Sequence, residues 1–373
     1  MSIIVINAGS SSIKYSVYNA ATLEMIDHGL IEEVLDYHDG FIQMGVALVR
    51  HNIDICQIEG FAHRVVHGGD QFYAPVIIND LFIDEIRRLV PLAPLHNAAN
   101  IEGIMAARTI APNVPHIAVF DTSFHQTMPP YAYRYPLPHD LYENYHIRRY
   151  GFHGSSHDYV SRKGSEHLGL PREILNLITF HIGNGVSACA IRQGISIDTS
   201  MGMTPLEGLM MGSRSGSIDP SIIGYLMREK HLTIDEIEIL LNKQSGLIAI
   251  AGTNDLRRII EAKNAGEPNA ELAVEMFCYR LRKQLGAYMA VLDGVNAIIF
   301  TGGIGEHSAL VRKTMCEKLD HLDIRIDDEQ NTHNALFIHQ HNSTVKLLVI
   351  PTDEEYQIAS YAQALLLDKS SLK

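Results

Sequence analysis

The 373-residue sequence lacks several patterns that would place it in other classes of protein. Its formal net charge of −13 argues against a nucleic-acid-binding groove, because such grooves concentrate basic residues. No stretch approaches the ~20 uninterrupted apolar residues that a membrane-spanning helix requires. The first residues contain no basic segment followed by an apolar run, so no signal peptide is expected. The sequence therefore predicts a cytoplasmic protein that binds neither nucleic acid nor a membrane.

Cysteine is scarce, and its spacing excludes a C-x-x-C site. The four cysteines, Cys56, Cys189, Cys278 and Cys316, are dispersed along the chain. Such spacing indicates buried or idle thiols in a reducing compartment.

Two signatures of phosphate binding are also absent. The chain contains no Walker A run, Gly-x-x-x-x-Gly-Lys-Ser/Thr, and no Gly-x-Gly-x-x-Gly fingerprint between a strand and a helix.

Two distant stretches nevertheless share one pattern: an apolar strand, a turn of small residues and a second strand. The first runs from Ile3 to Tyr18, and the second runs from Leu177 to Ile191. Apolar and polar residues alternate by two after each turn, which indicates strands rather than a helix. Backbone N–H groups and hydroxyls in such turns can bind an anion. The pair predicts two similar halves that close on a polyphosphate, although either turn alone could be an ordinary β-hairpin.

The remaining pattern is typical of an α/β protein with more than one domain. The length suits two domains, and a hydrophobic content of 46% with a mean hydropathy of +0.01 provides an ample core. Strands alternate with helices, which are expected at 83–90, 97–109 and 269–293. Another helix is expected to start at Asp219-Pro220, with Asp219 as its N-cap. A third glycine loop, Gly302 to Gly305, follows a buried strand.

Three residues could bind a phosphate group. Arg64 ends an apolar piece, and Arg214 lies between small residues and is therefore expected in a loop, where a guanidinium can meet phosphate or carboxylate. A structural salt bridge is the alternative for each. His153, flanked by Gly151 and Gly154, is expected to donate to phosphoryl oxygens. His157 gives it a partner at i+4, but a glycine follows the first histidine where a zinc protease has glutamate, so zinc is disfavoured.

Oxygen-bearing side chains at expected strand ends could hold Mg²⁺, which prefers oxygen ligands and accompanies nucleotides. The candidates are Asn7, Asp121, and either Glu354 or Glu355. Carboxylates at the mouth of an α/β sheet occupy common site positions. A nucleotide could lie along the third glycine loop, with Asp255 to Arg257 as a second wall.

Five motifs in the right order resemble those of the acetate kinases, the short-chain carboxylate kinase family of the sugar kinase, Hsp70 and actin superfamily. The match extends over nearly the whole chain. The motifs are Asn7-Ala8-Gly9-Ser10-Ser11-Ser12-Ile13-Lys14, Arg64-Val65-Val66-His67-Gly68-Gly69, Gly151-Phe152-His153-Gly154, His181-Ile182-Gly183-Asn184-Gly185 and Thr301-Gly302-Gly303-Ile304-Gly305-Glu306.

The resemblance implies an α/β fold of two duplicated ribonuclease H-like domains with an active-site cleft between them. The domain limits are expected at 1–122 plus 356–373, and at 123–355. The resemblance also implies a phosphotransferase with a carboxyl group as acceptor. Such an enzyme transfers the γ-phosphoryl group of ATP to acetate reversibly, giving acetyl phosphate and ADP. Mg²⁺ is the implied cofactor, with Mn²⁺ as an alternative, and a homodimer is the implied assembly.

The same resemblance assigns roles to individual residues. Asp121, His153, Arg214 and Arg64 are the implied catalytic residues, and Arg64, Val66, Leu95 and Pro205 the implied contacts to the acid. Asn7 and Glu354 are the implied metal ligands. The implied ATP-binding residues are Lys14, Ser10, Ser12, His181, Ile182, Gly183, Asn184, Gly185, Asp255, Leu256, Arg257, Gly303, Ile304, Gly305, Glu306 and His307.

Acetate is already ionised at pH 7, so its attack on phosphorus requires no general base. Asp121 is therefore expected to orient an arginine or a metal-bound water rather than to abstract a proton. Catalysis is expected to consist mainly of positioning and charge neutralisation. Val66 should leave less room than the alanine expected of a propionate-preferring relative. Acetate is therefore the expected substrate, with propionate tolerated.

Two departures from the family pattern and three rival functions complete the sequence-based picture. His307 stands where the glycine loop usually ends in asparagine, and the chain is shorter than most members between Leu30 and Phe61. The rivals are a propionate or butyrate kinase, an Hsp70- or actin-like nucleotide switch, and a phosphatase in which water replaces the acid.

Overall fold

A computed structural model describes residues 1–9, 12–54 and 57–370, apart from the side chains of residues 94–96, 369 and 370. Ser10 and Cys56 therefore lie outside the described residues. The chain forms two compact units, which are described separately. The first comprises Met1–Gln126, Gly154–Ser156 and Asp353–Lys373, and the second comprises Thr127–His153 and His157–Thr352. The domain limits expected from the sequence, 1–122 plus 356–373 and 123–355, remain a prediction.

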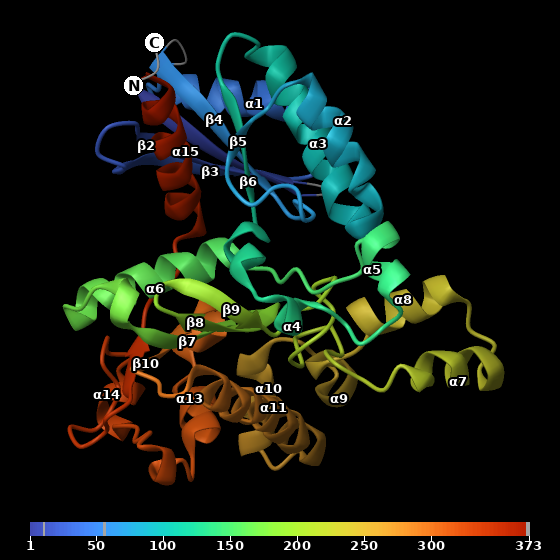
Figure 1. Ribbon diagram of the computed structural model, residues 1–373, viewed down its shortest axis with the longest axis vertical. Helices are drawn as coiled ribbons and strands as arrows, with labels where there is room; N and C mark the ends of the chain where they lie inside the picture. The colour runs from blue at the N-terminus through green and yellow to red at the C-terminus, as the bar shows by residue number, and fades with distance from the viewer. Residues whose placement is uncertain (10–11, 55–56, 371–373) are drawn as a thin grey trace. The chain divides into compact units, whose positions relative to one another are not determined.

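The first unit contains a six-stranded sheet with the order β3-β2-β1-β4-β6-β5 (Figure 1). The strands β1, β2 and β3 are antiparallel, β4 and β6 run parallel to β1, and β5 is a short antiparallel edge strand. The strands span Ser2–Gly9 (β1), Ser12–Asn19 (β2), Met25–Ile31 (β3), Ile58–Val65 (β4), Val76–Ile77 (β5) and His116–Phe120 (β6).

The second unit contains a five-stranded sheet with the order β11-β10-β7-β8-β9. The strands β7, β8 and β9 are antiparallel, and β10 and β11 run parallel to β7. The strands span Asn176–Ile182 (β7), Val186–Arg192 (β8), Ile195–Thr199 (β9), Ala297–Thr301 (β10) and Lys346–Val349 (β11).

The two sheets repeat one topology. In each, an antiparallel meander of three strands is followed by two parallel strands on the other side of the first strand, so β1-β2-β3-β4-β6 corresponds to β7-β8-β9-β10-β11. Both phosphate-binding hairpins expected from the sequence are the first hairpin of a meander, β1-β2 and β7-β8. The predicted duplicated α/β fold is therefore confirmed.

Helices cover both faces of the first sheet (Figure 1). Ile4 and Ile6 of β1 pack against α1 (Tyr37–Arg50) and α3 (Pro94–Ile110) on one face. Ile3 and Val5 pack against α15 (Glu354–Ser370) on the other. Because both faces are covered, Ser16 and Tyr18 of β2 are buried as well as Tyr15 and Val17, and the period of two does not separate an exposed face there. The helix α2 spans Asp80–Arg88.

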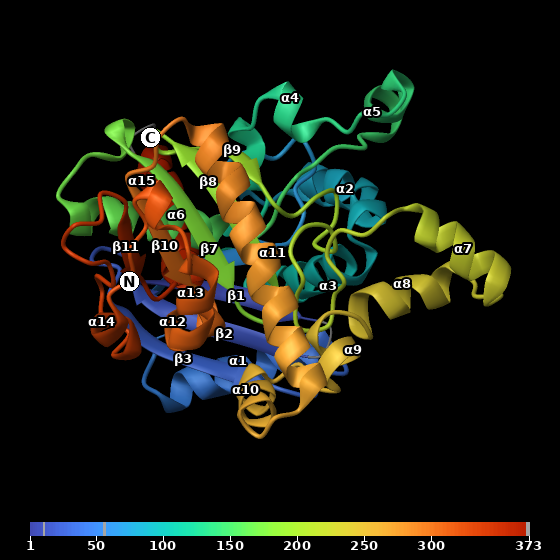
Figure 2. The same ribbon diagram turned by 90° about the horizontal axis from the view of Figure 1, so that it is seen from below.

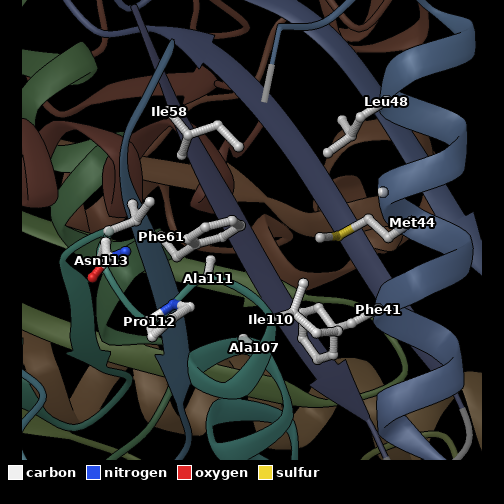
Figure 3. Close-up of a pocket in the computed structure, with 12 residues that line it drawn as sticks. Phe41, Met44, Leu48, Ile58, Phe61, Ala107, Ile110, Ala111, Pro112 and Asn113 are labelled. Atoms are coloured by element: carbon white, nitrogen blue, oxygen red, sulfur yellow. The ribbon is translucent and has the colours of Figure 1, made fainter. Parts of the chain in front are cut away.

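An apolar cavity of about 300 Å³ lies between α1, β4 and the end of α3 (Figure 3). Phe41, Met44 and Gly45 line it from α1, and Phe61 lines it from β4. It belongs to the face of the sheet that α1 covers. Such a cavity deprives the side chains that line it of some packing contacts.

In the second unit, α6 (Gly154–Leu168) covers one face of the sheet and α11 (Pro268–Leu292) crosses the other (Figure 2). None of the helices that the structure describes has the length and apolar character to cross a membrane. The remaining helices are α4 (Pro130–Tyr133), α5 (His139–Tyr145), α7 (Ser221–Glu229), α8 (Ile234–Lys243), α9 (Leu247–Ala251), α10 (Leu256–Asn264), α12 (Gly302–His307), α13 (Ala309–Cys316) and α14 (Asp328–Thr332).

One local expectation is shifted by a residue and another was wrong. The helix α7 begins at Ser221, one residue later than expected, although the Asp219 carboxylate accepts from the Ser221 N–H as an N-cap residue does. The segment Gly302 to Gly305 is not a loop but the start of the short helix α12. Its first residue has φ of +75°, which glycine adopts without strain.

Candidate active site

The carboxyl ends of the parallel strands in the first unit gather the site residues expected there. Asn7 lies near the end of β1, Arg64 near the end of β4, and Asp121 directly after β6. Glu354 begins α15, which packs on the same sheet. Neighbouring parallel strands end at one edge of a sheet, so these four side chains meet. We call Asn7, Arg64, Asp121 and Glu354 the arginine–carboxylate cluster.

Arg64 is held by Asp121 in a two-pronged ion pair. Its Nε lies 3.1 Å from Asp121 Oδ1 and its Nη2 lies 2.5 Å from Asp121 Oδ2. The Asp121 side chain is only 2% exposed, so the pair compensates a buried charge. Burial lowers the pKa of the Arg64 guanidinium, but Asp121 and Glu354 raise it by more. In this geometry, Asp121 fixes the orientation of the Arg64 guanidinium.

Glu354 is the uncompensated acid of the arginine–carboxylate cluster. Its Oε2 lies 4.0 Å from Arg64 Nε, beyond hydrogen-bonding distance. Burial raises the pKa of Glu354 to about 7, and Asp121 and Glu355 add to the rise while Arg64 opposes it. Glu355 itself pairs with Lys14 at 2.5 Å. The cluster would therefore be stabilised by a further positive charge close to Glu354.

The segment that follows Arg64 is fixed by two buried asparagines that the sequence analysis missed. Asn100 on α3 accepts from the N–H of Val66 and donates to the carbonyl of Ala8, so it joins β4 to β1. Asn97 bonds both the N–H and the carbonyl of His67. Nothing in the sequence marks these two asparagines, because their partners lie 30 or more residues away along the chain. Val66 is 9% exposed, whereas the side chain of Leu95 lies outside the described residues.

A second group of candidates meets over the glycine turn between β7 and β8. A Cβ atom added at Gly185 would lie 3.4 Å from His153 Nε2 and 3.6 Å from Arg214 Nη1. The ring of His181 lies 4.2 Å from that of His153, centroid to centroid. Only glycine leaves open the space in front of these groups. We call His153, His181, Gly185 and Arg214 the glycine-turn cluster.

Arg214 differs from Arg64 in having no carboxylate beside it among the residues that the structure describes. Its Nη1 donates to the carbonyl of Pro205 at 3.2 Å and lies 3.8 Å from the sulfur of Met211. Burial lowers its pKa, and no acidic group opposes this. A half-buried guanidinium that remains protonated and lacks an anion is prepared to bind one. The salt bridge that was the alternative for Arg214 is absent from the described part of the chain.

His153 is linked to the interior of the second unit. Its Nδ1 lies 2.9 Å from the Ser187 hydroxyl, which also lies 2.8 Å from His157 Nε2. His157 Nδ1 in turn lies 2.7 Å from the Thr179 hydroxyl. The second histidine of the i+4 pair therefore uses both ring nitrogens on hydroxyl groups. The sequence analysis considered His157 only as a zinc ligand and missed Ser187 and Thr179.

The expected nucleotide-binding stretches of the second unit differ in their accessibility. Asn184 lies in the glycine turn, where its side-chain oxygen accepts from Asn254 and its carbonyl accepts from Gly212. Asp255 caps α10 and pairs with Arg257, which lowers the pKa of Asp255. Leu256 and Ile182 differ from these residues because they are buried, at 6% and 0% exposed, and contribute to the core.

The short helix α12 is held from both ends. Glu306 Oε1 accepts from the N–H of Gly302 and from the N–H of Thr352. Arg312, fully buried, donates to the carbonyls of Gly305 and Glu306. Gly303 faces open space, and the side chain of His307 is 76% exposed and lies 4.0 Å from Glu306. The structure thus gives Glu306 a supporting position and leaves Gly303 and His307 accessible.

The described residues contain no group of three or more His, Cys, Asp or Glu side chains arranged to hold a metal ion. The oxygens of Asn7 and Glu354 have the donor chemistry that Mg²⁺ requires. Burial raises the pKa of Glu354 to about 7.

Comparison with known proteins identifies the family of this chain. The model of the Acetokinase family matches residues 35–360. The chain belongs to the Acetokinase family. An acetate kinase of this family from Syntrophobacter fumaroxidans is 47% identical over 392 residues, which cover 96% of this chain and 95% of that protein.

Solved structures of Acetokinase relatives share the fold. A propionate kinase from Francisella tularensis is similar with a TM-score of 0.93 and 41% identity, covering 96% of this chain and 98% of that one. An acetate kinase from Porphyromonas gingivalis is similar with a TM-score of 0.91 and 37% identity, covering 98% and 99%. Relatives named for two different acids therefore resemble this chain closely.

Proposed function

We propose that this chain catalyses reversible phosphoryl transfer from ATP to acetate, with acetyl phosphate and ADP as products. The observation that carries the proposal is the half-buried Arg214, which has no carboxylate beside it in the described part of the chain and shares the glycine turn with His153. Such a pair suits the charge on a phosphoryl group in transfer. Membership of the Acetokinase family supplies the class of reaction.

The reaction is a direct in-line displacement. A carboxylate oxygen of acetate forms a bond to the γ-phosphorus, and the bond from that phosphorus to the bridging oxygen breaks, so ADP leaves with the electron pair. No proton is transferred, because acetate reacts as its anion. Asp121 therefore need not act as a base, and its ion pair with Arg64 fixes a cation for the approaching acid.

The two clusters divide the work. Arg64 and Val66, in the first unit, bind the acid, and Arg214 and His153, in the second, bind the transferring phosphoryl group. Lys14, Ser12 and the glycine turn bind the remaining phosphates. Gly303, His307, Asn184 and the Asp255–Arg257 wall contact the rest of the nucleotide.

A divalent cation, Mg²⁺ or alternatively Mn²⁺, is held by Asn7 and Glu354 in this proposal. When bound, it neutralises charge on the nucleotide phosphates. Glu354 would hold the cation in its carboxylate form, whereas burial by itself favours the protonated form of this group. Asn7 supplies a neutral oxygen that needs no such deprotonation.

Propionate is the second candidate acid, because the Francisella tularensis relative is a propionate kinase. The two acids differ by one methylene, which a pocket distinguishes by only ~1–3 kcal/mol. Val66, with its β-branched side chain, favours the smaller acid. We therefore expect acetate to be preferred and propionate to be used.

One assay tests the proposal against its rivals. The protein is incubated with ATP, Mg²⁺ and hydroxylamine in the presence of acetate, propionate or butyrate, and acyl hydroxamate is measured. A carboxylate kinase produces hydroxamate in proportion to its use of each acid. Release of phosphate without hydroxamate would indicate a phosphatase or a nucleotide switch instead, and the proposal would fail.

Two further expectations accompany this function. A cytoplasmic location suits an enzyme that uses ATP and acetate, and a homodimer is the assembly that the sequence resemblance implied. Both remain predictions. Sedimentation of the purified protein at micromolar concentration tests the second of them directly.

A further inference from the structure

A chain of hydrogen bonds connects the glycine-turn cluster to the core of the second unit. It runs from Thr179 on β7 to His157 on α6, then to Ser187 on β8, and ends at His153 Nδ1, with distances of 2.7, 2.8 and 2.9 Å. Thr179, His157 and Ser187 are each 0% exposed. Burial favours neutral imidazole rings and fixes the hydrogen-bond partners.

Two directions of the chain keep the Ser187 hydrogen within it, and any other arrangement leaves that buried hydrogen without an acceptor in the chain. A neutral imidazole carries one N–H and one acceptor nitrogen, and the Ser187 hydroxyl has one hydrogen. In the outward direction, Thr179 donates to His157, His157 donates to Ser187, and Ser187 donates to His153 Nδ1. In the inward direction every bond is reversed. The outward direction leaves the hydrogen of His153 on Nε2, whereas the inward direction places it on Nδ1.

Thr179 decides between the two directions. Within the described residues, the hydroxyl of Thr179 has one hydrogen-bond partner, His157 Nδ1. In the inward direction Thr179 accepts from His157, so its own buried hydrogen has no acceptor, which is costly. In the outward direction every donor in the chain is used. The outward direction is therefore the more stable.

We propose that Thr179, His157 and Ser187 are positioning residues that keep His153 in the Nε2–H tautomer, so that it donates to the transferring phosphoryl group. The proposal rests on the proposed function for its consequence, although the tautomer itself does not. His153 Nε2 is the atom that lies over Gly185, 3.4 Å from the position of an added Cβ and on the same face as Arg214 Nη1. A hydrogen on Nδ1 would leave Nε2 as a lone pair facing phosphoryl oxygen, which repels it.

Nitrogen-15 NMR of histidine-labelled protein at pH 8 tests the tautomer without turnover. The His153 signals are assigned by their loss in His153→Gln. We expect Nε2–H for His153 in the wild type and a substantial share of Nδ1–H in Ser187→Ala. Nδ1–H in the wild type, or an imidazolium at this pH, overturns the proposal.

Two matched pairs of variants test the kinetic consequence. Ser187→Ala should lower kcat roughly 10–100-fold, less than the 10²–10³-fold for loss of a donor outright, with little change in the KM for ATP. Ser196→Ala removes an equally buried hydroxyl from β9 and should leave kcat unchanged. Thr179→Val should lower kcat by about tenfold, whereas Thr179→Ser keeps the donor and should restore it.

These outcomes separate the two proposals. Equal kcat in Ser187→Ala and the wild type, or in Thr179→Val and Thr179→Ser, overturns the positioning role. Absence of acyl hydroxamate with every acid overturns the proposed function instead, and the NMR result then still decides the tautomer. Thermal unfolding of each variant shows that a loss of kcat does not come from a loss of folded protein.

Discussion

Arg64 and Arg214 place the same side chain in opposite electrostatic settings. Arg64 is bound in two-pronged fashion by Asp121, whereas Arg214 donates to a carbonyl and has no carboxylate beside it among the described residues. An arginine that is already paired is held in one orientation. The N–H groups outside the ion pair remain available to a ligand. An arginine with no anion beside it gains more free energy when an anion binds. The first unit thus carries a fixed positive group, and the second unit carries an available one.

Replacing Arg214 with alanine should abolish most of the activity. An arginine on a transferring phosphoryl group contributes ~10³–10⁵ in rate, equivalent to roughly 4–7 kcal/mol of barrier. We therefore expect a fall of this size in kcat for hydroxamate formation. Arg228→Ala, which removes an exposed arginine from α7, is the matched control and should behave as the wild type. Unchanged turnover in Arg214→Ala would refute the assigned role.

Val66 should control the choice of acid. Val66→Ala removes two methyl groups and makes room for the extra methylene of propionate. The ratio of kcat/KM for propionate to that for acetate should rise by about tenfold, within the range that one methylene allows. Val49→Ala, on the exposed face of α1, should leave the ratio unchanged. An unaltered ratio in Val66→Ala would place the acid elsewhere.

The sequence revealed the residues that carry a motif but not the residues that support them. Arg64, Asp121, His153 and Arg214 stand out through their glycine-rich surroundings or their place after an apolar strand. Ser187, like Asn97 and Asn100, is separated by tens of residues from its hydrogen-bond partners, so nothing local marks it. Such partners become visible only when the strands and helices are assembled.

Elements defined by periodicity were predicted well, and the element that depends on distant contacts was not. The hairpins β1-β2 and β7-β8 and the long helix α11 follow local patterns. The helix α12 contains three glycines, which disfavour a helix by about 1 kcal/mol each. Its helical form depends on Glu306 at its first turn and on the carbonyl contacts of Arg312 at its last. Neither contact can be read from the six residues themselves.

Two glycines of α1 should respond to alanine in opposite ways. A Cβ at Gly45 would meet no atom within 4 Å, beside the cavity, so Gly45→Ala should stabilise the protein by up to about 1 kcal/mol. A Cβ at Gly40 would lie 2.8 Å from Ile13 Cδ1, so Gly40→Ala should destabilise it by about 1–3 kcal/mol. Thermal unfolding measures both, and a lower Tm for Gly45→Ala would contradict the open geometry.

For the whole molecule, buried titratable groups give opposing dependences of stability on pH. Burial lowers the pKa of His63, and burial likewise lowers that of His116, whose Nδ1 lies 2.9 Å from His63 Nε2. The contribution of these two histidines to the free energy of unfolding is complete above pH 6.5 and is lost as the pH falls below that value. Glu354, with its pKa raised from 4.5 to about 7, contributes below pH 4.5 and loses that contribution as the pH rises through 7.

Replacing Glu354 with glutamine should therefore remove the contribution of this carboxyl group to the pH dependence of stability. In the absence of divalent cations, Glu354→Gln should be more stable than the wild type at pH 8, by up to about 3 kcal/mol, and this advantage should shrink toward pH 4.5. Urea unfolding between pH 5 and pH 8 measures the difference. The variant should also lose stabilisation by Mg²⁺ and most of its activity.

The exposed Glu238 on α8 provides the control for this experiment. Glu238→Gln should follow the stability of the wild type at every pH, since the change removes one solvated charge. If Glu354→Gln also follows the wild type, the buried carboxyl is not the source of the pH dependence.

The position of α15 has a consequence for the synthesis of the protein. The sheet face formed by Ile3, Val5 and Ala62 is covered by Ile358, Ala359 and Ala362 of that helix. About 230 residues are translated between β6 and α15, which takes on the order of 10–50 s at 5–20 residues per second. The second unit has all of its strands before α15 leaves the ribosome. The half of the protein that is made first is thus the half that finishes folding last, and one face of its sheet stays uncovered until α15 has been made.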